Sequence, residues 1–250
     1  MADFNLNKEG IIVTVNGPVM KIQIDRPHEK NGMNWKAMNV LSDAYEFVAS
    51  DPDIRVIVMT GTGEYFYTGG RVNAGDPEEQ RLYAEAITRS GMIKKKINIP
   101  TIAAVNGDCL KAGMGWLLEA DMAVAKKTAR FGFPEVRMGG VPMMVMVSAM
   151  SMPKKLALAS LYSSDTFDAE TAYQMGLVNC IVEDEDFWPT VEQYIHKVID
   201  YPKALIQMTR DAYYTMAELP TRKERVAYAQ KMLQEKVLPY MATGKTEYNV

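Results

Sequence analysis

Cysteine and histidine are scarce in this sequence, with two of each among 250 residues. Cys109 and Cys180 lie far apart in the chain, so they give no disulfide framework and are typical of a reducing compartment. His28 and His196 stand at no metal-ligand spacing from another histidine, cysteine or carboxylate. The sequence therefore predicts neither a disulfide-stabilised fold nor a metal site.

Long apolar runs and a strong charge of either sign are also missing. No apolar run is long enough to cross a bilayer, and the polar start MADFNLNKEG lacks the core of a signal peptide. The net charge of -3 provides no basic field that would hold nucleic acid. We therefore expect a cytoplasmic protein with neither a membrane nor a nucleic-acid partner.

Three common glycine- or serine-based motifs are absent as well. Gly61-Thr62-Gly63 and Gly113-Met114-Gly115 each begin a G-x-G, but Phe66 and Leu118 stand where a dinucleotide-binding fingerprint has its third glycine. No phosphate-loop lysine motif and no G-x-S-x-G elbow is present. The sequence therefore lacks the usual signatures of nucleotide-binding enzymes and of serine hydrolases.

The hydrophobic pattern predicts an α/β fold. Apolar and polar residues alternate in 11–15 and 19–24 around Asn16-Gly17-Pro18, which predicts a β-hairpin. Asn34 is the expected N-cap of a helix that ends at Asp51-Pro52. Further strands are expected at 56–60, 101–105 and 122–125, and further helices at 78–97, 112–120, 145–161, 168–175, 187–200, 203–217 and 221–240. Strands that alternate with helices indicate a layered α/β domain.

The sequence offers no linker at which the chain would divide. We expect a single domain over residues 1–250, with an α/β core at 1–185 and a helical region at 186–250. The helical region carries a surplus of aromatic and apolar residues, which suits an oligomer interface.

Three segments together resemble the crotonase (enoyl-CoA hydratase/isomerase) superfamily. They are VIVMTGTGEYFYTGGRV at 56–72, IPTIAAVNGDCLKAGMGWLLEADMAVA at 99–125 and ARFGFPEVRMGGVP at 129–142, with weaker matches at 24–34 and 167–182. The resemblance implies a crotonase-like spiral of ββα units with a helical C-terminal region. It also implies an acyl-CoA thioester as substrate and a homotrimer or hexamer as the assembly.

In that family two backbone N–H groups hold the thioester oxygen, and the resemblance assigns them here to Gly70 and Ala112. Both residues are small, so a ligand can approach the backbone closely. The expected helix start at Ala112 favours negative charge, and one such donor contributes roughly 3 kcal/mol to an oxyanion. The alternative is that these small residues only make tight turns.

Glu135 matches the family carboxylate that moves protons at the substrate. A partly buried carboxylate can have the raised pKa that this task needs. The alternative for Glu135 is a surface residue that caps the next element or pairs with Arg137.

Gly115 departs from the family pattern, because hydratases of this family carry a second glutamate there. The departure favours a Δ3-Δ2 enoyl-CoA isomerase with Glu135 as its one base. Alternatives are a hydratase, dehydratase or decarboxylase on a CoA- or carrier-protein-bound acid, including polyketide β-branching, or a non-catalytic binding protein. Accessory proton-transfer groups would be Glu119, Asp108 or Tyr67.

Coenzyme A, as part of the substrate, is the only cofactor that the resemblance implies. It assigns CoA contacts to Arg26, Lys30, Gly70 and Val72. Arg71 stands where many relatives have an acidic residue, and it either binds a phosphate or substrate carboxylate or makes a surface contact. The methionines of the segment 141–150 either line an apolar acyl pocket or fill a helix core.

Overall fold

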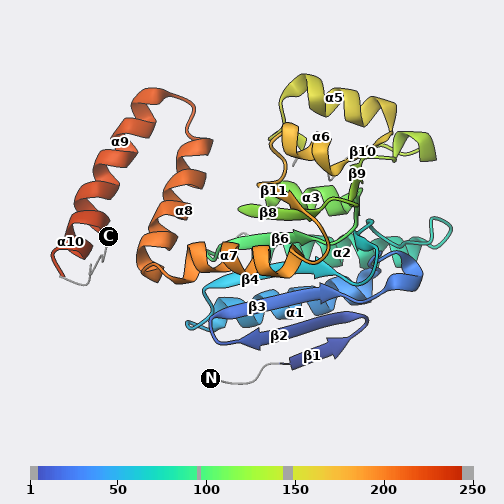
Figure 1. Cartoon of the computed structure of the whole chain (residues 1–250), viewed down its shortest axis with the longest axis horizontal. Helices are drawn as coiled ribbons and strands as arrows, with labels where there is room; N and C mark the ends of the chain where they lie inside the picture. The colour runs from blue at the N-terminus through green and yellow to red at the C-terminus, as the bar shows by residue number, and fades with distance from the viewer. Residues whose placement is uncertain (1–4, 95–96, 143–148, 244–250) are drawn as a thin grey trace. The chain divides into compact units, whose positions relative to one another are not determined.

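The strands of this protein form two sheets in the computed structural model, which describes residues 5–94, 97–142 and 149–243 (Figure 1). The seven-stranded sheet has the order β1 (Asn5–Lys8), β2 (Ile11–Asn16), β3 (Val19–Ile24), β4 (Val56–Gly61), β6 (Thr101–Val105), β8 (Met122–Lys126), β11 (Cys180–Val182). The four-stranded sheet has the order β10 (Thr166–Asp168), β9 (Arg130–Gly132), β7 (Asp108–Leu110), β5 (Tyr65–Tyr67). Both sheets belong to the first of two compact units, Met1–His196 and Lys197–Val250.

The chain passes repeatedly from the larger sheet to the smaller one. β4 leads into β5, β6 into β7 and β8 into β9, and within each sheet these strands run parallel. A helix follows the first two pairs, α2 (Pro77–Lys94) after β5 and α3 (Ala112–Glu119) after β7. This arrangement confirms the predicted α/β class and the spiral of ββα units.

The N-terminal elements confirm two local predictions. β2 and β3 pair antiparallel around Gly17, whose φ of 55° suits a tight hairpin turn. The Asn34 side chain accepts a hydrogen bond from the Ala37 N–H at 3.0 Å and caps α1 (Trp35–Ser50). α1 ends where Asp51 adopts an extended conformation before Pro52.

Two predicted helices differ from the structure. The expected helix at 145–161 is wrong around Pro153, because residues 150–152 are not helical and Pro153 is the N-cap of α5 (Lys154–Ser163). The expected helix at 221–240 is divided into α9 (Arg222–Met232), a π-helical segment (Leu233–Val237) and α10 (Leu238–Met241). Residues 143–148, which include Met143, Met144 and Met146 of the predicted acyl pocket, lie outside the described residues.

The remaining helices are short connectors and a C-terminal group. They are η1 (Pro27–Glu29), η2 (Val136–Met138), α6 (Ala169–Gln174), α7 (Phe187–Ile199) and α8 (Lys203–Glu218). Within the second unit, Lys236 in the π-helical segment pairs with Asp211 of α8 at 3.2 Å. Exposed apolar side chains in this unit include Tyr213, Val226 and Leu238, and the expected oligomer interface there stays a prediction.

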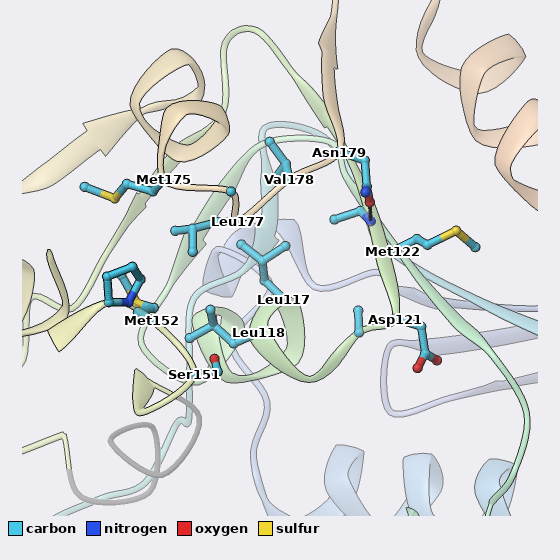
Figure 2. Close-up of a pocket in the computed structure, with 14 residues that line it drawn as sticks. Leu117, Leu118, Asp121, Met122, Ser151, Met152, Met175, Leu177, Val178 and Asn179 are labelled. Carbon is cyan, nitrogen blue, oxygen red and sulfur yellow. Dashed lines mark hydrogen bonds between the residues drawn. The ribbon is translucent and has the colours of Figure 1, made fainter. Parts of the chain in front are cut away.

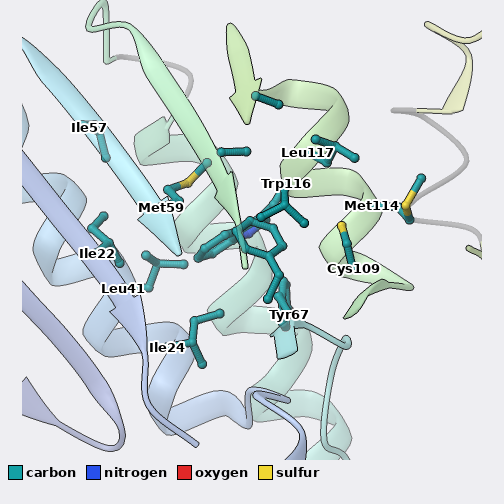
Figure 3. Close-up of a cluster of buried hydrophobic side chains, with 14 of the residues drawn as sticks. Ile22, Ile24, Leu41, Ile57, Met59, Tyr67, Cys109, Met114, Trp116 and Leu117 are labelled. Atoms are coloured by element: carbon teal, nitrogen blue, oxygen red, sulfur yellow. The ribbon is translucent and has the colours of Figure 1, made fainter. Parts of the chain in front are cut away.

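The core lies on the faces of the larger sheet. All residues of β4 and β6 are buried, as expected for parallel strands that are covered on both sides. Figure 3 shows Tyr67 and Trp116 packed together in this core, with ring centroids 5.1 Å apart. β5 is therefore anchored against α3 by aromatic side chains.

Two buried asparagines hold the turn between β4 and β5, and Asn31 is the first. Its side-chain amide donates hydrogen bonds to the carbonyl oxygens of Thr62 at 2.9 Å and Tyr65 at 2.5 Å. Its Oδ1 accepts from the Arg26 N–H at 2.9 Å. The 24–34 segment is thereby joined to the turn that precedes β5.

Asn106, at the end of β6, holds the same turn from the other side. Its side-chain amide donates to the carbonyl oxygens of Gly63 at 2.8 Å and Tyr65 at 3.2 Å. Its Oδ1 accepts from the Gly61 N–H at 2.8 Å. Both asparagines therefore bind the Tyr65 carbonyl and fix the direction in which β5 leaves the turn.

Replacement of Asn106 by alanine is expected to lower the free energy of unfolding by about 2–4 kcal/mol. The substitution leaves a buried N–H and a carbonyl without partners, and each unsatisfied group costs about 1–3 kcal/mol. Urea denaturation followed by circular dichroism measures the change. Asn7→Ala, at an exposed position of β1, serves as control and should stay within about 0.5 kcal/mol of wild type. An equal effect in both variants would contradict the role given to Asn106.

Candidate active site

Gly70 follows β5 in a segment that pairs with Met33. The Met33 N–H donates to the Gly69 carbonyl at 3.1 Å, and the Arg71 N–H donates to the Met33 carbonyl at 2.9 Å. In this parallel pattern the N–H of Gly70 itself points away from Met33. A Cβ atom on Gly70 would overlap the hydroxyl of Tyr83, so a larger residue at this position would require the Tyr83 side chain to move.

Ala112 is the first residue of α3, and its N–H therefore has no acceptor within the helix. A Cβ atom on Gly113 would overlap the carbonyl oxygen of Tyr67, which shows that α3 begins in direct contact with β5. A Cβ atom built on Gly69 would lie 3.5 Å from the Ala112 nitrogen. The structure thus brings the two predicted N–H donors, of Gly70 and Ala112, onto neighbouring segments.

Glu135 lies between β9 and η2 with its carboxyl group half-buried. Its Oε2 atom is buried and accepts no hydrogen bond from any residue that the structure describes. Burial raises the pKa of the Glu135 carboxyl above its ordinary value, while the nearby Lys111 ammonium opposes the rise. Arg137 pairs with Asp165 instead of Glu135, so the predicted surface pair is not formed. A buried carboxylate oxygen without a partner can accept a proton from a bound substrate.

Lys111 is a site residue that the sequence reasoning missed. It precedes Ala112, and its Cδ would lie 3.0 Å from a Cβ atom built on Gly69. Burial lowers the pKa of the Lys111 ammonium, and the Arg71 guanidinium lowers it further, while Glu135 opposes the change. No sequence pattern indicated Lys111, because its neighbours come from segments that are distant in the chain.

Tyr67, a predicted accessory group, is connected to the site through Tyr83 of α2. Burial raises the pKa of the Tyr67 hydroxyl, and its hydrogen bond with Tyr83 adds to the rise. The Tyr83 hydroxyl in turn lies against Gly70. Tyr83 was not predicted, because the sequence around a single tyrosine on an amphipathic helix does not indicate which distant residues its hydroxyl contacts.

Two other predicted accessory groups lie in different surroundings. Asp108 is half-buried in β7, and burial raises the pKa of its carboxyl while Arg130 and Lys30 oppose the rise. Glu119 is exposed at the last position of α3, roughly 10 Å along the helix from Ala112 at 1.5 Å per residue. The structure therefore does not bring Glu119 to the N–H donors.

The predicted CoA contacts lie beside the Met33–Gly70 bridge. The Arg26 guanidinium donates to the carbonyl oxygens of Gly32 at 2.9 Å and Glu9 at 2.7 Å, and it pairs with the Glu29 carboxylate at 2.5 Å. Arg26 thus holds the 26–32 turn together. Lys30 is exposed on that turn, and Val72 is half-buried two residues after Gly70.

A separate cavity of ≈ 200 Å³ adjoins the C-terminal half of α3. Figure 2 shows Leu117, Leu118, Leu177 and Val178 gathered around it. Its polar lining groups are already bound, for example Asp121, whose Oδ2 accepts from the Thr101 N–H at 2.7 Å. The cavity is smaller than the roughly 300–1,000 Å³ of ordinary ligand pockets, and it contains none of the predicted catalytic groups.

Two other features are absent from residues 5–94, 97–142 and 149–243, a cluster of metal ligands and a membrane-spanning helix. Histidine, cysteine, aspartate and glutamate do not gather there in groups of three or more that would hold a metal ion. In the same part of the chain, no helix combines the length and the apolar character needed to cross a membrane.

The chain is similar in sequence to known proteins over most of its length. A sequence profile described as enoyl-CoA hydratase/isomerase matches residues 14–246. The (E)-benzylidenesuccinyl-CoA hydratase of Thauera aromatica is 26% identical over 215 residues, which cover 84% of each chain. The crotonyl-CoA hydratase of Syntrophomonas wolfei is 27% identical over 217 residues, which cover 82% of this chain and 81% of that one.

The fold is also shared with solved structures. An enoyl-CoA hydratase from Mycobacterium smegmatis superposes with a TM-score of 0.84 at 22% identity, over 96% of this chain and 92% of that one. A family protein from Silicibacter pomeroyi superposes with a TM-score of 0.83 at 22% identity, over 90% of this chain and 98% of that one. At such identities the superpositions establish the fold alone.

The raised pKa of Glu135 predicts a pH-dependent gain of stability in Glu135→Gln. The folded state binds the Glu135 proton more tightly than the unfolded state does, so this group lowers stability as the pH rises from its unfolded pKa through its folded pKa. At neutral pH the glutamine variant should therefore unfold at a higher urea concentration than wild type. Below the ordinary glutamate pKa of about 4.3 the difference should vanish.

Urea midpoints at both pH values test this expectation. Glu218→Gln, at an exposed position of α8, is the control and should show no such pH-dependent gain. A Glu135→Gln variant that is less stable than wild type at neutral pH would show that the carboxylate is stabilised in the folded protein.

Proposed function

Since this chain belongs to the enoyl-CoA hydratase/isomerase family, we propose that it moves a proton on an acyl-CoA thioester. The matched profile confirms the family that the sequence motifs predicted. The observation that carries the proposal is Glu135, whose buried Oε2 has no partner among the described residues and whose carboxyl group interacts electrostatically with Lys111, the residue before Ala112. The chemistry uses coenzyme A only as part of the substrate.

The N–H groups of Gly70 and Ala112 would hold the thioester oxygen. Negative charge grows on that oxygen when a proton leaves the neighbouring carbon, so donors already in place lower the barrier. One donor of this kind contributes roughly 3 kcal/mol to the transition state. The helix start at Ala112 adds a favourable electrostatic field.

Glu135 would act as the base. In a 3-enoyl thioester it takes a proton from C2, the C2–H electron pair forms the enolate, and the charge spreads over the C3–C4 double bond. Glu135 then returns the proton to C4, which leaves a 2-enoyl thioester of unchanged mass. The raised pKa of Glu135 suits both halves of this cycle, because the group must give back the proton that it accepts.

Gly115 supports isomerisation over addition of water. It lies in α3, one turn beyond Ala112, and a glycine at this place neither holds a proton nor orients a water molecule. One carboxylate is sufficient for a transfer between two carbons, whereas hydration needs a nucleophilic water to be placed as well. We therefore assign the Δ3-Δ2 isomerase reaction as the first candidate.

Hydration or dehydration is the second candidate, and the named relatives favour it. Two of them are hydratases of CoA thioesters, and carnitinyl-CoA dehydratases match at 26–27% identity. In this case another group would orient the water, and Tyr67 is the predicted accessory residue with a path to Gly70, through Tyr83. Decarboxylation, a carrier-protein thioester and simple binding are the further outcomes that an assay must separate.

The experiment supplies the purified protein with a 3-enoyl-CoA and, separately, a 2-enoyl-CoA, and follows products by chromatography and mass spectrometry. We expect the 3-enoyl thioester to become the 2-enoyl isomer without a change of mass. Glu135→Gln should slow this conversion by about 10²–10⁴-fold, the usual contribution of a general base. Incubation of a saturated acyl-CoA in D₂O tests enolate formation by itself, through exchange of the C2 protons.

Each outcome has a distinct meaning. A gain of the mass of water would establish the hydratase reaction and contradict the isomerase assignment. Exchange in D₂O without either product would keep the enolate chemistry but show that the natural substrate differs. The absence of both exchange and conversion would overturn the proposed function for CoA thioesters.

A further inference from the structure

Two cationic side chains adjoin the two proposed N–H donors, one beside each. Arg71 follows Gly70 and Lys111 precedes Ala112 in the sequence. The Lys111 side chain lies along Gly69, since its Cδ is 3.0 Å from a Cβ atom built there. The Arg71 side chain lies against Gly32, with its Cζ 2.6 Å from a Cβ atom built on that glycine. Both cations are therefore held by close packing against glycine backbone.

The backbone of Lys111 adopts a conformation that side chains rarely accept. Its φ of 55° and ψ of -123° lie in a region that glycine populates readily. Strained residues of this kind persist where the surrounding structure over-determines them, and they cluster at functional sites. A lysine at this position therefore indicates a role for its side chain that glycine would not supply.

Neither cation has an anionic partner in the part of the chain that the structure describes. Arg71 donates only to oxygen atoms without charge, the Glu29 carbonyl at 2.5 Å and the Thr68 hydroxyl at 3.3 Å, with a long contact to the Gly70 carbonyl. Lys111 forms no ion pair with Glu135, although the two groups affect each other electrostatically. Two neighbouring half-buried cations, neither of them in an ion pair with a described carboxylate, form a site that lacks an anion.

We propose that Arg71 and Lys111 form a carboxylate-binding subsite, and that the natural substrate is a CoA thioester whose acyl group carries a second carboxylate. The inference rests on the proposed function, because it places the acyl group by means of the Gly70 and Ala112 N–H donors. Arg71 supplies a planar guanidinium and Lys111 a mobile ammonium, a combination that suits an anion at the end of a short chain.

The phosphates of coenzyme A do not account for these cations equally well. The pantetheine arm separates the phosphates from the sulfur, whereas Lys111 is the immediate neighbour of the residue that would hold the thioester oxygen. An anion that reaches Lys111 must therefore lie close to the acyl carbonyl. A carboxylate of the acyl group satisfies this condition.

Calorimetric titration of the purified protein with matched saturated thioesters tests the subsite. Succinyl-CoA is compared with butyryl-CoA, and glutaryl-CoA with pentanoyl-CoA, so that the members of each pair have equal carbon counts. We expect the dicarboxylic member of at least one pair to bind about tenfold or more tightly than its partner, as charge-assisted hydrogen bonds allow. Lys111→Met and Arg71→Met should remove this preference, so that the two members of each pair bind within about twofold of each other.

A second variant distinguishes the loss of the subsite from the loss of the folded state. Lys111→Gly relieves the left-handed backbone, so its melting temperature should equal or exceed that of wild type while the preference for the dicarboxylic thioester is lost. Lys36→Met, an exposed cation on α1, is the matched control and should keep the preference.

The outcomes separate this inference from the proposed function. Equal affinity for both members of each pair in the wild-type protein would overturn the carboxylate subsite and leave the proposed function intact. No binding of any thioester would overturn both. Variants that weaken all thioesters and free coenzyme A equally would assign the two cations to a phosphate and also overturn the subsite.

Discussion

Contacts between glycines and the backbone of residues 64–67 set the geometry on which this site depends. A Cβ atom on Gly61 would overlap the Tyr65 carbonyl, one on Gly107 would overlap the Glu64 carbonyl, and one on Gly113 would overlap the Tyr67 carbonyl. β4, the start of β7 and the start of α3 therefore close directly on one short segment. Because Gly70 continues from that segment and Ala112 adjoins Gly113, this packing also sets how close the two N–H donors lie.

Polar groups near this segment fall into two classes, those that have hydrogen-bond partners and those that lack them. Asn31 and Asn106 both hydrogen-bond the turn before β5, with both side-chain amides on the Tyr65 carbonyl. Glu135 instead has a buried carboxylate oxygen without a hydrogen-bond partner among the described residues, and Lys111 has a positive φ that side chains rarely adopt. Both features lower the stability of the fold. Stability is thus concentrated in the supporting turn, and it is given up at the groups that would meet the substrate.

Sequence patterns predicted those features that arise within one continuous segment. The Asn34 cap, the hairpin at Gly17 and the buried parallel strands follow from local propensity and from a clear period. The smaller sheet was missed because its strands have three residues each, too few to show alternation. Among site residues, the family pattern pointed to Gly70, Ala112 and Glu135, whereas Tyr83 and Lys111 depend on contacts between distant segments that no local pattern encodes.

The two proposed oxygen-binding groups belong to the main chain, and this affects how the protein would respond to sequence change. Substitution scanning alters side chains, so it leaves the N–H of residue 112 in place whichever ordinary residue other than proline stands there. At position 70 such a scan would report the size of each side chain against the Tyr83 hydroxyl and would be silent about hydrogen bonding. Only backbone chemistry, such as replacement of a single amide by an ester, removes these donors alone. Side-chain changes at these two positions would therefore act on the space around the donors and leave the donor groups themselves in the chain.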